Sequence, residues 1–282
     1  MPPVLQKYRH PNERLYGGLL TGTGLILWLF LGIIAVAASI TDPRAAAEFV
    51  VFAVYAVSFM LALVIFAALY RAYAMGHMVL LSEKQFPHLH SMFVEVSQKL
   101  GLAETPTAFI YNSGGIMNAF AIRLLRGRYV FLTSAIVEAE EDEQIRFIMA
   151  HEVAHHVLGH LSGFKHSLRL PAYMVPFLYR AYSRAREYSC DAVGASVLPD
   201  ARHALGALQM LACGVKRLNA SMNVEAFAAQ EYAVPSVAGF VLEISSTHPR
   251  TTRRVARIRA LFAMRDAPQL EARARLSPDI LD

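Results

Sequence analysis

Two long runs of apolar residues stand near the start of the chain. Residues 17–40 contain no charged residue, and residues 49–70 contain Ser58 as their only clearly polar one. A helix needs about 20 apolar residues to cross roughly 30 Å of hydrocarbon, so each run is long enough to span a membrane. Because only residues 41–48 separate them, the pattern predicts a transmembrane hairpin within residues 1–75. A cleaved signal peptide and buried core helices are the alternatives, but the length of the runs and their lack of charge favour spans.

Positive charges beside the hairpin predict its orientation. Five Lys or Arg residues flank the hairpin closely on its outer sides, and the loop between the runs holds one. The flanking residues are Lys7, Arg9, Arg14, Arg71 and Lys84, and the loop residue is Arg44. Lys and Arg are retained on the cytoplasmic side of membrane spans. We therefore expect both termini, and the part of the chain after the hairpin, in the cytoplasm.

The remaining residues, 76–282, show the shorter periodicities of a globular domain. Apolar positions at the helical period predict a helix from Ser82 to Leu100, and Ser82 and Gln85 resemble a capping box. Short apolar segments bounded by turn residues predict strands at residues 106–112, 117–122 and 128–133. Further helices are expected at about residues 141–161, 184–198, 201–218 and 250–264. These elements predict a mainly α fold with a small β-sheet, an α+β domain.

Two segments of this domain have a composition of their own. Residues 170–179 are a third apolar run, which is too short to span a bilayer and contains two prolines, so we expect it in the core or at the membrane interface. Residues 250–264 are a basic amphipathic helix, whose arginines we expect on a solvated face or against anionic lipid. No recognised nucleic-acid-binding module accompanies this helix, and we therefore expect no nucleic-acid partner.

Overall composition narrows the class of protein without changing this picture. Of 282 residues, 55% are hydrophobic and 17% are charged, which excludes an intrinsically disordered chain. Two Cys exclude a disulfide scaffold and fit a reducing compartment. The net charge of +5 would suit nucleic acid, but in an apolar chain basic residues more often flank membrane spans.

One helix of the predicted domain carries the pattern of a metal site. His151 and His155 are four residues apart, so both imidazoles lie on one helical face and can bind one ion. Glu152, next to the first histidine, is placed to take a proton from a water that the metal activates. His156 and His160 follow on the same helix, and we expect them to be structural. A helix that merely carries surface histidines is the alternative.

A catalytic zinc site needs a third protein ligand. In a metzincin this ligand follows the second histidine by six residues, where the chain has Leu161, so that class is excluded. Glu187 and Asp191 share a face of another predicted helix, where Glu187 can bind the metal and Asp191 can accept the free N–H of a ligand histidine. A solvent-exposed acidic face is the alternative for this pair. Cys190 is a rival ligand, but it lies on a different face of the helix, and a buried small side chain is the simpler interpretation.

Several separated motifs together resemble the M48 family of membrane-associated zinc metallopeptidases. The matching segments are His151–His155 for its HExxH motif, Glu187 and Asp191 for its ExxxD motif, Met117–Ala121 for its Asn-Ala-Phe segment, Thr247–Pro249 with Arg254 for its His-Pro…Arg motif, and Glu143 for an acidic residue eight positions before the first histidine. The resemblance covers about residues 82–261. It implies a gluzincin-type zinc peptidase domain at residues 76–282, with the hairpin as its membrane anchor.

The resemblance also implies roles for individual residues at the metal. One Zn²⁺ per chain would be held by His151, His155 and Glu187, with Asp191 behind a ligand histidine. Glu152 would act as general base and later pass its proton to the leaving amine. With these roles, the resemblance implies a zinc-dependent endopeptidase.

Further expectations concern the substrate. His248 is the candidate donor to the oxyanion, Arg254 supports it, and Asn118 would hold the substrate backbone. We expect a peptide to bind as an added strand along Tyr129–Thr133. This mode recognises backbone more than side chains, which suits quality control of unfolded or membrane proteins, with the hairpin in the lipid bilayer of a bacterial inner membrane.

Two other functions stay open on the sequence, and the chain departs from the family in three places. A catalytically silent membrane scaffold would retain the zinc fold, and a zinc hydrolase could act on lipids or small amides. The heat-shock branch of the family carries further spans between the ligands, where this chain has only residues 156–186. Cys190 stands where Ala is common, and Arg250 stands where Pro is common. These departures leave the substrate preference open.

Overall fold

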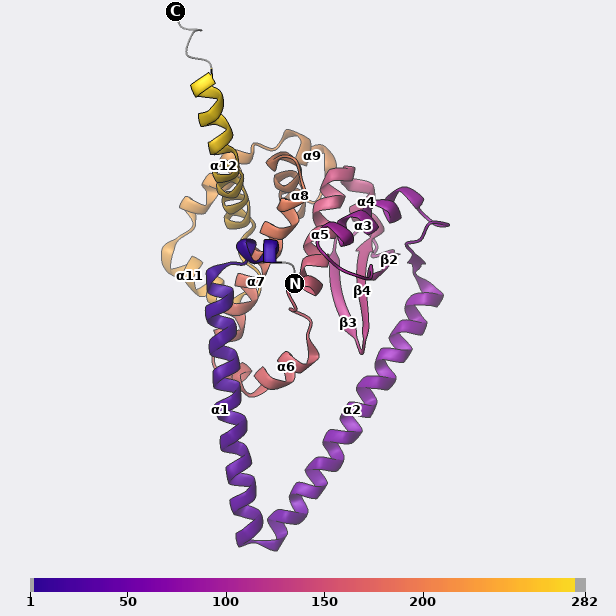
Figure 1. Cartoon of the computed structure of the whole chain (residues 1–282), viewed down its shortest axis with the longest axis vertical. Coiled ribbons are helices and arrows are strands. Elements are labelled where there is room, and N and C mark those ends of the chain that lie inside the picture. The colour runs from indigo at the N-terminus through magenta and orange to yellow at the C-terminus, as the bar shows by residue number, and fades with distance from the viewer. Residues whose placement is uncertain (1–2, 277–282) are drawn as a thin grey trace, which may run out of the picture.

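The two apolar runs form the longest helices of the computed structural model, which describes residues 3–276. α1 spans Pro11–Thr41 and α2 spans Pro43–His77. Between them, the Asp42 side chain accepts a hydrogen bond from the backbone N–H of Arg44 and so caps α2. The two helices diverge from this turn as the arms of a V, and the rest of the chain fills the open end (Figure 1).

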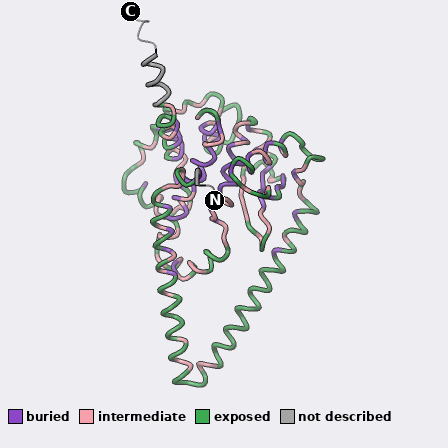
Figure 2. Tube along the Cα trace, in the orientation of Figure 1, coloured by how far each residue is buried: buried purple, intermediate pink, exposed green. Residues whose placement is uncertain are grey.

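Most side chains of the arms are exposed, although the arms carry the longest apolar runs of the chain (Figure 2). The most apolar 18-residue windows of α1 and α2 have mean hydropathies of 2.4 and 2.8, and only 6% and 0% of these windows are buried. A core helix of a soluble protein would bury such a window. The arms are therefore not core helices, and they are long and apolar enough to cross a membrane.

The first residues of the chain pack with the part that follows the hairpin. A 3₁₀ helix, η1, covers Pro3–Tyr8, and Leu5 within it belongs to the main apolar core. Leu20, at the third turn of α1, is buried against Ala172 and Tyr182. Residues before the predicted boundary at residue 75 therefore pack with residues after it. The division of the chain into a hairpin and a peptidase domain stays a prediction.

A four-stranded sheet lies near the upper end of α2 (Figure 1). Its strands are β1 (Val79–Leu80), β2 (Thr107–Tyr111), β3 (Ala119–Leu124) and β4 (Gly127–Thr133), in the order β1-β2-β4-β3. β2 runs parallel to β4, and β3 runs antiparallel to it. Because β4 is paired on both sides, the expectation that a peptide adds along Tyr129–Thr133 is wrong. Within the described residues, the open edge on this side of the sheet belongs to β3.

Helices make up most of the remaining chain. They are α3 (Pro87–Lys99), α4 (Ser134–Ala139), α5 (Asp142–Val157), α6 (Gly163–Arg169), η2 (Leu170–Met174), α7 (Leu178–Ser196), α8 (Ala201–Cys213), α9 (Lys216–Ser221), α10 (Val224–Ala229), η3 (Gln230–Ala233), α11 (Ser236–Ser245) and α12 (Thr251–Leu276). The helix expected from Ser82 begins later, because Ser82 and Gln85 pair across a turn and Phe86 is left-handed, with φ of 60°. The helix expected at residues 201–218 is interrupted at Gly214, whose φ is 72°.

α5 is the central helix of the core. It begins with a capping box between Glu141 and Gln144, and it packs against α7, α8 and the sheet. Buried apolar residues point to several of its sides, including Phe147, Ile148 and Met149, which are successive in the helix. Packing therefore fixes this helix on several sides, and with it the two histidines of the predicted metal site.

Candidate metal centre

Two crossing helices bring the predicted ligands together. His151 and His155 lie on α5, and Glu187 lies on α7. The close approach of these helices depends on Gly194, where an added Cβ would lie 3.1 Å from the Phe147 ring. His151 and Glu187 are buried, and His155 is partly exposed. The crossing turns both imidazoles toward the carboxylate.

The distances from each histidine nitrogen to the Glu187 carboxylate are close to the spacing of donor atoms in a tetrahedral metal site. Nε2 of His151 lies 3.4 Å from Oε2 of Glu187, and Nε2 of His155 lies 3.7 Å from Oε1. Atoms that bind zinc at about 2.0–2.1 Å in a tetrahedron stand about 3.3 Å apart. The three side chains therefore fit the donor set of a zinc ion.

Asp191 contacts the first histidine from behind. Its Oδ1 lies 3.0 Å from Nδ1 of His151, and Arg254 of α12 donates to both Asp191 oxygens at 2.6 and 2.8 Å. A proton on Nδ1 leaves the lone pair of Nε2 directed at Glu187, so this contact selects the tautomer that a metal needs. Arg254 is buried, so it does not share the solvated face expected for the arginines of its helix.

The electrostatic surroundings of His151 also favour a metal site. Burial alone would lower the pKa of His151, but the Asp191 and Glu187 carboxylates raise it to about 10. Burial would raise the pKa of Glu187, and the two histidines instead hold it below its ordinary value. The two carboxylates thus favour positive charge between them. A dication would meet that requirement in place of a proton, so protons and metal compete for this site.

A second network, which the sequence did not predict, lies behind His155. Nδ1 of His160 is 3.2 Å from Nδ1 of His155, and Nε2 of His160 is 3.1 Å from Oε1 of Glu13 in α1. Glu13 also accepts a hydrogen bond from Ser189 at 2.5 Å and pairs with Arg9 at 3.1 Å. His160, expected on the same helix and directed elsewhere, instead follows the end of α5 and contacts His155. Its partner Glu13 is 147 positions away, and nothing in a single sequence relates the two residues.

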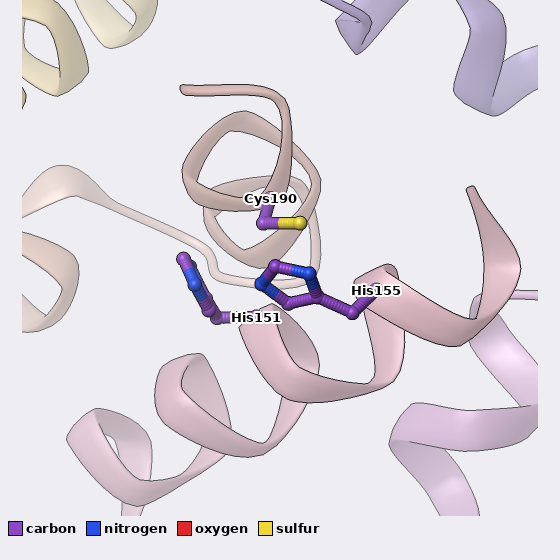
Figure 3. A group of neighbouring side chains, drawn as sticks. All are labelled: His151, His155 and Cys190. Carbon is purple, nitrogen blue, oxygen red and sulfur yellow. The ribbon is translucent and has the colours of Figure 1, made fainter. Parts of the chain in front are cut away.

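Cys190 is the other candidate for the third ligand. One donor atom each from His151, His155 and Cys190 lie within 4.8 Å of one another, and Figure 3 shows the three side chains pointing together. The sulfur, however, lies 3.5 Å from Nδ1 of His160, and so belongs to the network behind His155. Burial and the surrounding carboxylates raise the pKa of the Cys190 thiol well above its ordinary value, which disfavours the thiolate that binds metal. We therefore favour Glu187.

Glu152 lies beside the ligands in a cleft of about 180 Å³. The cleft is lined by Asn118, Ala119, Ile136, Phe147, Ile148, His151, Glu152, Glu187, Leu211, His248 and Arg254. Burial raises the pKa of the Glu152 carboxyl to about 7, while His151 and the backbone of Ala121 in β3 oppose the rise. A carboxyl group with this pKa can both accept and release a proton near neutral pH.

The remaining predicted residues lie around the mouth of the cleft. Nε2 of His248 is 3.8 Å from Oε2 of Glu187, and its side chain is 66% exposed. Asn118 immediately precedes β3, and its backbone carbonyl accepts a hydrogen bond from the N–H of Thr133. His156 points away from the site and reaches the carbonyl of Tyr129 at 3.1 Å, which ties α5 to β4.

The family that these residues resemble is also found by comparison of the whole chain. The family model described as peptidase family M48 matches residues 83–169 and 162–262. These segments cover more than half of the chain and include every residue of the site. The chain belongs to peptidase family M48. Within this M48 protein, the matched part begins after the hairpin and ends in α12.

Two relatives that match in sequence agree with this assignment. The chloroplastic plastoglobule-localized metallopeptidase 48 of Arabidopsis thaliana is 25% identical over 169 residues, which are 55% of this chain and 48% of that protein. A protease HtpX homolog of Bacillus licheniformis is 26% identical over 234 residues, which are 66% of this chain and 75% of that protein. This chain thus matches about half the length of the chloroplast relative. The crystal structure of Ste24p from S. mikatae aligns with a TM-score of 0.43 and 14% identity, over 83% of this chain and 66% of that one.

Proposed function

We propose that this M48 protein is a zinc-dependent endopeptidase held on a membrane by its hairpin. The observation that carries the proposal is the convergence of His151, His155 and Glu187 at the spacing of a zinc site, with Glu152 in the same cleft. The family match and the HtpX homologs, which are named as proteases, support it. When bound, zinc would polarise the scissile carbonyl and lower the pKa of a water in the site.

The residues of the chain supply the proton transfers and the charge stabilisation. Glu152 lies in the same cleft as the ligands, takes a proton from the attacking water and later gives it to the leaving amine. His248 stands at the mouth of the cleft, where its Nε2 can donate to the developing oxyanion. Asp191, held by Arg254, keeps Nε2 of His151 directed at the metal position.

We infer that a peptide binds along β3. Its outer edge is unpaired among the described residues, and Asn118 and Ala119 at its start line the cleft. An extended peptide can pair with such an edge through its backbone, which requires little of the side chains. This breadth suits degradation of unfolded or membrane proteins. The charges beside the hairpin favour a cytoplasmic catalytic domain, and a bacterial inner membrane is the proposed location.

The proposal is tested by Glu152→Gln in the full-length protein, reconstituted in lipid vesicles. We expect the variant to keep zinc, because Glu152 is not a ligand, and to lose cleavage of an unfolded casein-like protein by at least about 10²-fold. Zinc content is measured by elemental analysis and cleavage by gel. Glu104→Gln, at an exposed position, is the matched control and should cleave as wild type does.

Three results would contradict the proposal in different ways. Cleavage by Glu152→Gln at the wild-type rate would show that Glu152 is not the general base. Zinc-loaded wild-type protein that cleaves no peptide would favour a scaffold, and chelator-sensitive release of fatty acid or small amide products would favour a hydrolase of those substrates.

A further inference from the structure

The segment that joins the two ligand helices lies along the first arm of the hairpin. This joining segment, residues 163–177, comprises α6, η2 and the three residues before α7. Its contact with α1 is close, because a Cβ at Gly24 would collide with the carbonyl oxygen of Leu168. Trp28 of α1 donates from Nε1 to the carbonyl of Ser167 at 3.1 Å. The segment is thus fixed against the apolar run of α1, between the two arms (Figure 1).

The position of these contacts along α1 gives their depth in a bilayer. The polar turn at Asp42 marks the far end of the span, and about 20 residues, enough to cross the hydrocarbon, lead back from it to Gly22. Trp28 lies 14 residues before Asp42, or about 21 Å at 1.5 Å per residue. In hydrocarbon about 30 Å thick, Ser167 then lies roughly 9 Å inside the near boundary. Arg169 donates to Thr21 at 2.9 Å, which places its guanidinium at that boundary.

The outward face of the joining segment is apolar and uncovered. The side chains of Phe164, Leu170, Met174 and Phe177 are 80%, 52%, 86% and 46% exposed. Four large apolar side chains exposed on so short a segment are unusual for a surface in water. The segment contacts α1 at Trp28, and neighbouring side chains of α1, such as Leu25 and Leu29, are also apolar and exposed. Whatever surrounds the span therefore also surrounds this face.

Charge on the segment points to the same surroundings. Residues 161–186 contain no Asp or Glu. Lys165 and Arg180 are exposed at the two ends of the apolar face, and Arg169 stacks over the Tyr182 ring at 4.8 Å. Basic residues around an apolar face are typical of segments that lie in the interface of a membrane with anionic lipids.

We propose that residues 163–177 form a third membrane contact, which lies in the leaflet nearest the catalytic domain. Phe164, Leu170 and Met174 enter the acyl region, and Lys165 and Arg180 meet the lipid phosphates. Because this segment connects α5 with α7, the membrane holds the metal site from the helices that carry its ligands as well as from the hairpin. The proposal needs the hairpin to be in the membrane, but it does not depend on catalysis.

The test measures the depth of single spin labels in the full-length protein in vesicles that contain anionic phospholipid. Cys213→Ser removes the less buried cysteine, and Cys190 is fully buried. A nitroxide is then attached at Phe164→Cys or Met174→Cys. Tyr232→Cys, 93% exposed on η3, is the water reference, and Phe30→Cys, 58% exposed in the span of α1, is the lipid reference.

We expect labels at 164 and 174 to collide more with oxygen than with a water-soluble nickel complex, as at position 30, and the reverse at 232. Collision ratios at 164 and 174 that equal the ratio at 232 would overturn the proposal. Labels that neither reagent reaches would also overturn it, because a protein partner would then cover the face. A label at 30 that meets mainly nickel would instead contradict the membrane assignment of the hairpin.

Discussion

Asp191 and Arg254 together determine which nitrogen of His151 is free for a metal. The carboxylate accepts from Arg254 through two oxygens and contacts Nδ1 of His151, and all three side chains are buried. A neutral amide at 191 could offer one oxygen only, and its NH₂ group would face the guanidinium. The amide oxygen, which is neutral, would accept from Nδ1 of His151 more weakly than the carboxylate does, so the tautomer would be less strongly fixed.

We expect Asp191→Asn to weaken zinc binding by about 10–100-fold, as is typical for loss of a partner behind a metal ligand. The affinity is measured by competition with a chromophoric chelator. Arg254→Lys, which keeps the charge and loses the two-pronged contact, should give a smaller loss. Arg259→Lys on the same helix is the matched control, since it pairs only with Glu225 near the surface. Equal zinc affinity in all four proteins would contradict this role.

Glu140 is a buried carboxyl group without a hydrogen-bond partner on either oxygen. Burial raises its pKa from 4.5 to about 7, Glu141 adds to the rise, and Lys216 opposes it. Between these two pH values the folded protein holds a proton that the unfolded chain has released. The stabilising effect of the proton is therefore complete below about pH 4.5 and is lost as the pH rises through about 7.

We expect Glu140→Gln to remove this loss, because an amide keeps the shape of the neutral acid at every pH. The variant should be more stable than the wild type by between about 1 and 3 kcal/mol at pH 8, and by little at pH 5. Denaturant unfolding in detergent at both pH values measures the difference. Glu138→Gln, at an exposed position of α4 just before Glu140, is the control and should show no such gain at pH 8. A gain equal at both pH values would point to a cause other than titration.

At the scale of elements, the sequence predicted what depends on local periodicity. Helix α5 and strands β2, β3 and β4 are found within about four residues of the predicted bounds, and α7 begins at Leu178, six residues before the predicted start at 184. The pattern failed where a local signal had two interpretations, since Ser82 and Gln85 close a turn instead of capping a helix. The pattern also did not predict the strand order. No local sequence signal indicates that β2 pairs with β4 and that β3 lies at the edge of the sheet.

In the candidate site, too, the sequence predicted the pairs that depend on local spacing and missed the contacts between distant residues. His151 with His155, and Glu187 with Asp191, are spaced by one helical turn within single helices, so the sequence shows both pairs. The contact of Glu13 with His160 joins residues far apart in the chain and has no such spacing. The sequence motif that includes Arg254 also did not predict its partner, because only the fold directs this side chain inward toward Asp191.

The contact between α1 and the joining segment depends on one glycine. An added Cβ at Gly24 would collide with the carbonyl oxygen of Leu168 and lie 3.1 Å from Cα of Arg169, and backbone atoms cannot move aside cheaply. At Gly22, in the same helix, an added Cβ meets nothing within 4 Å. The two positions form a matched pair that isolates the contact from helix propensity.

We expect Gly24→Ala to destabilise the protein by about 1–3 kcal/mol and to speed amide hydrogen exchange across residues 163–177. Gly22→Ala should leave both unchanged or slightly improved, because alanine favours a helix. Exchange in detergent micelles, followed by mass spectrometry, gives the measurement. Similar exchange in the two variants would show that the segment does not depend on this contact.

At the scale of the whole molecule, a single carboxylate joins the membrane hairpin to the metal site. Glu13 stands near the start of α1, only 4% exposed, and contacts His160, Ser189 and Arg9. Ser189 is on the helix of Glu187, and His160 follows the helix of His155. The network therefore reaches both ligand-bearing helices from the anchor. A shift of α1 would therefore move His160 and, through it, the ring of His155.

Removing the Glu13 carboxylate should therefore harm both stability and metal binding. We expect Glu13→Ala to lose about 3–5 kcal/mol, because Arg9 and His160 are left without their buried partner. Zinc affinity should fall as well, since the ring of His155 loses its fixed contact with His160. Denaturant unfolding and chelator competition in detergent measure the two effects. Glu48→Ala, exposed at the opposite end of the hairpin, is the control for loss of a charge from the arms. Loss of stability with unchanged zinc affinity would confine Glu13 to packing, whereas loss of both would make the anchor part of the metal site.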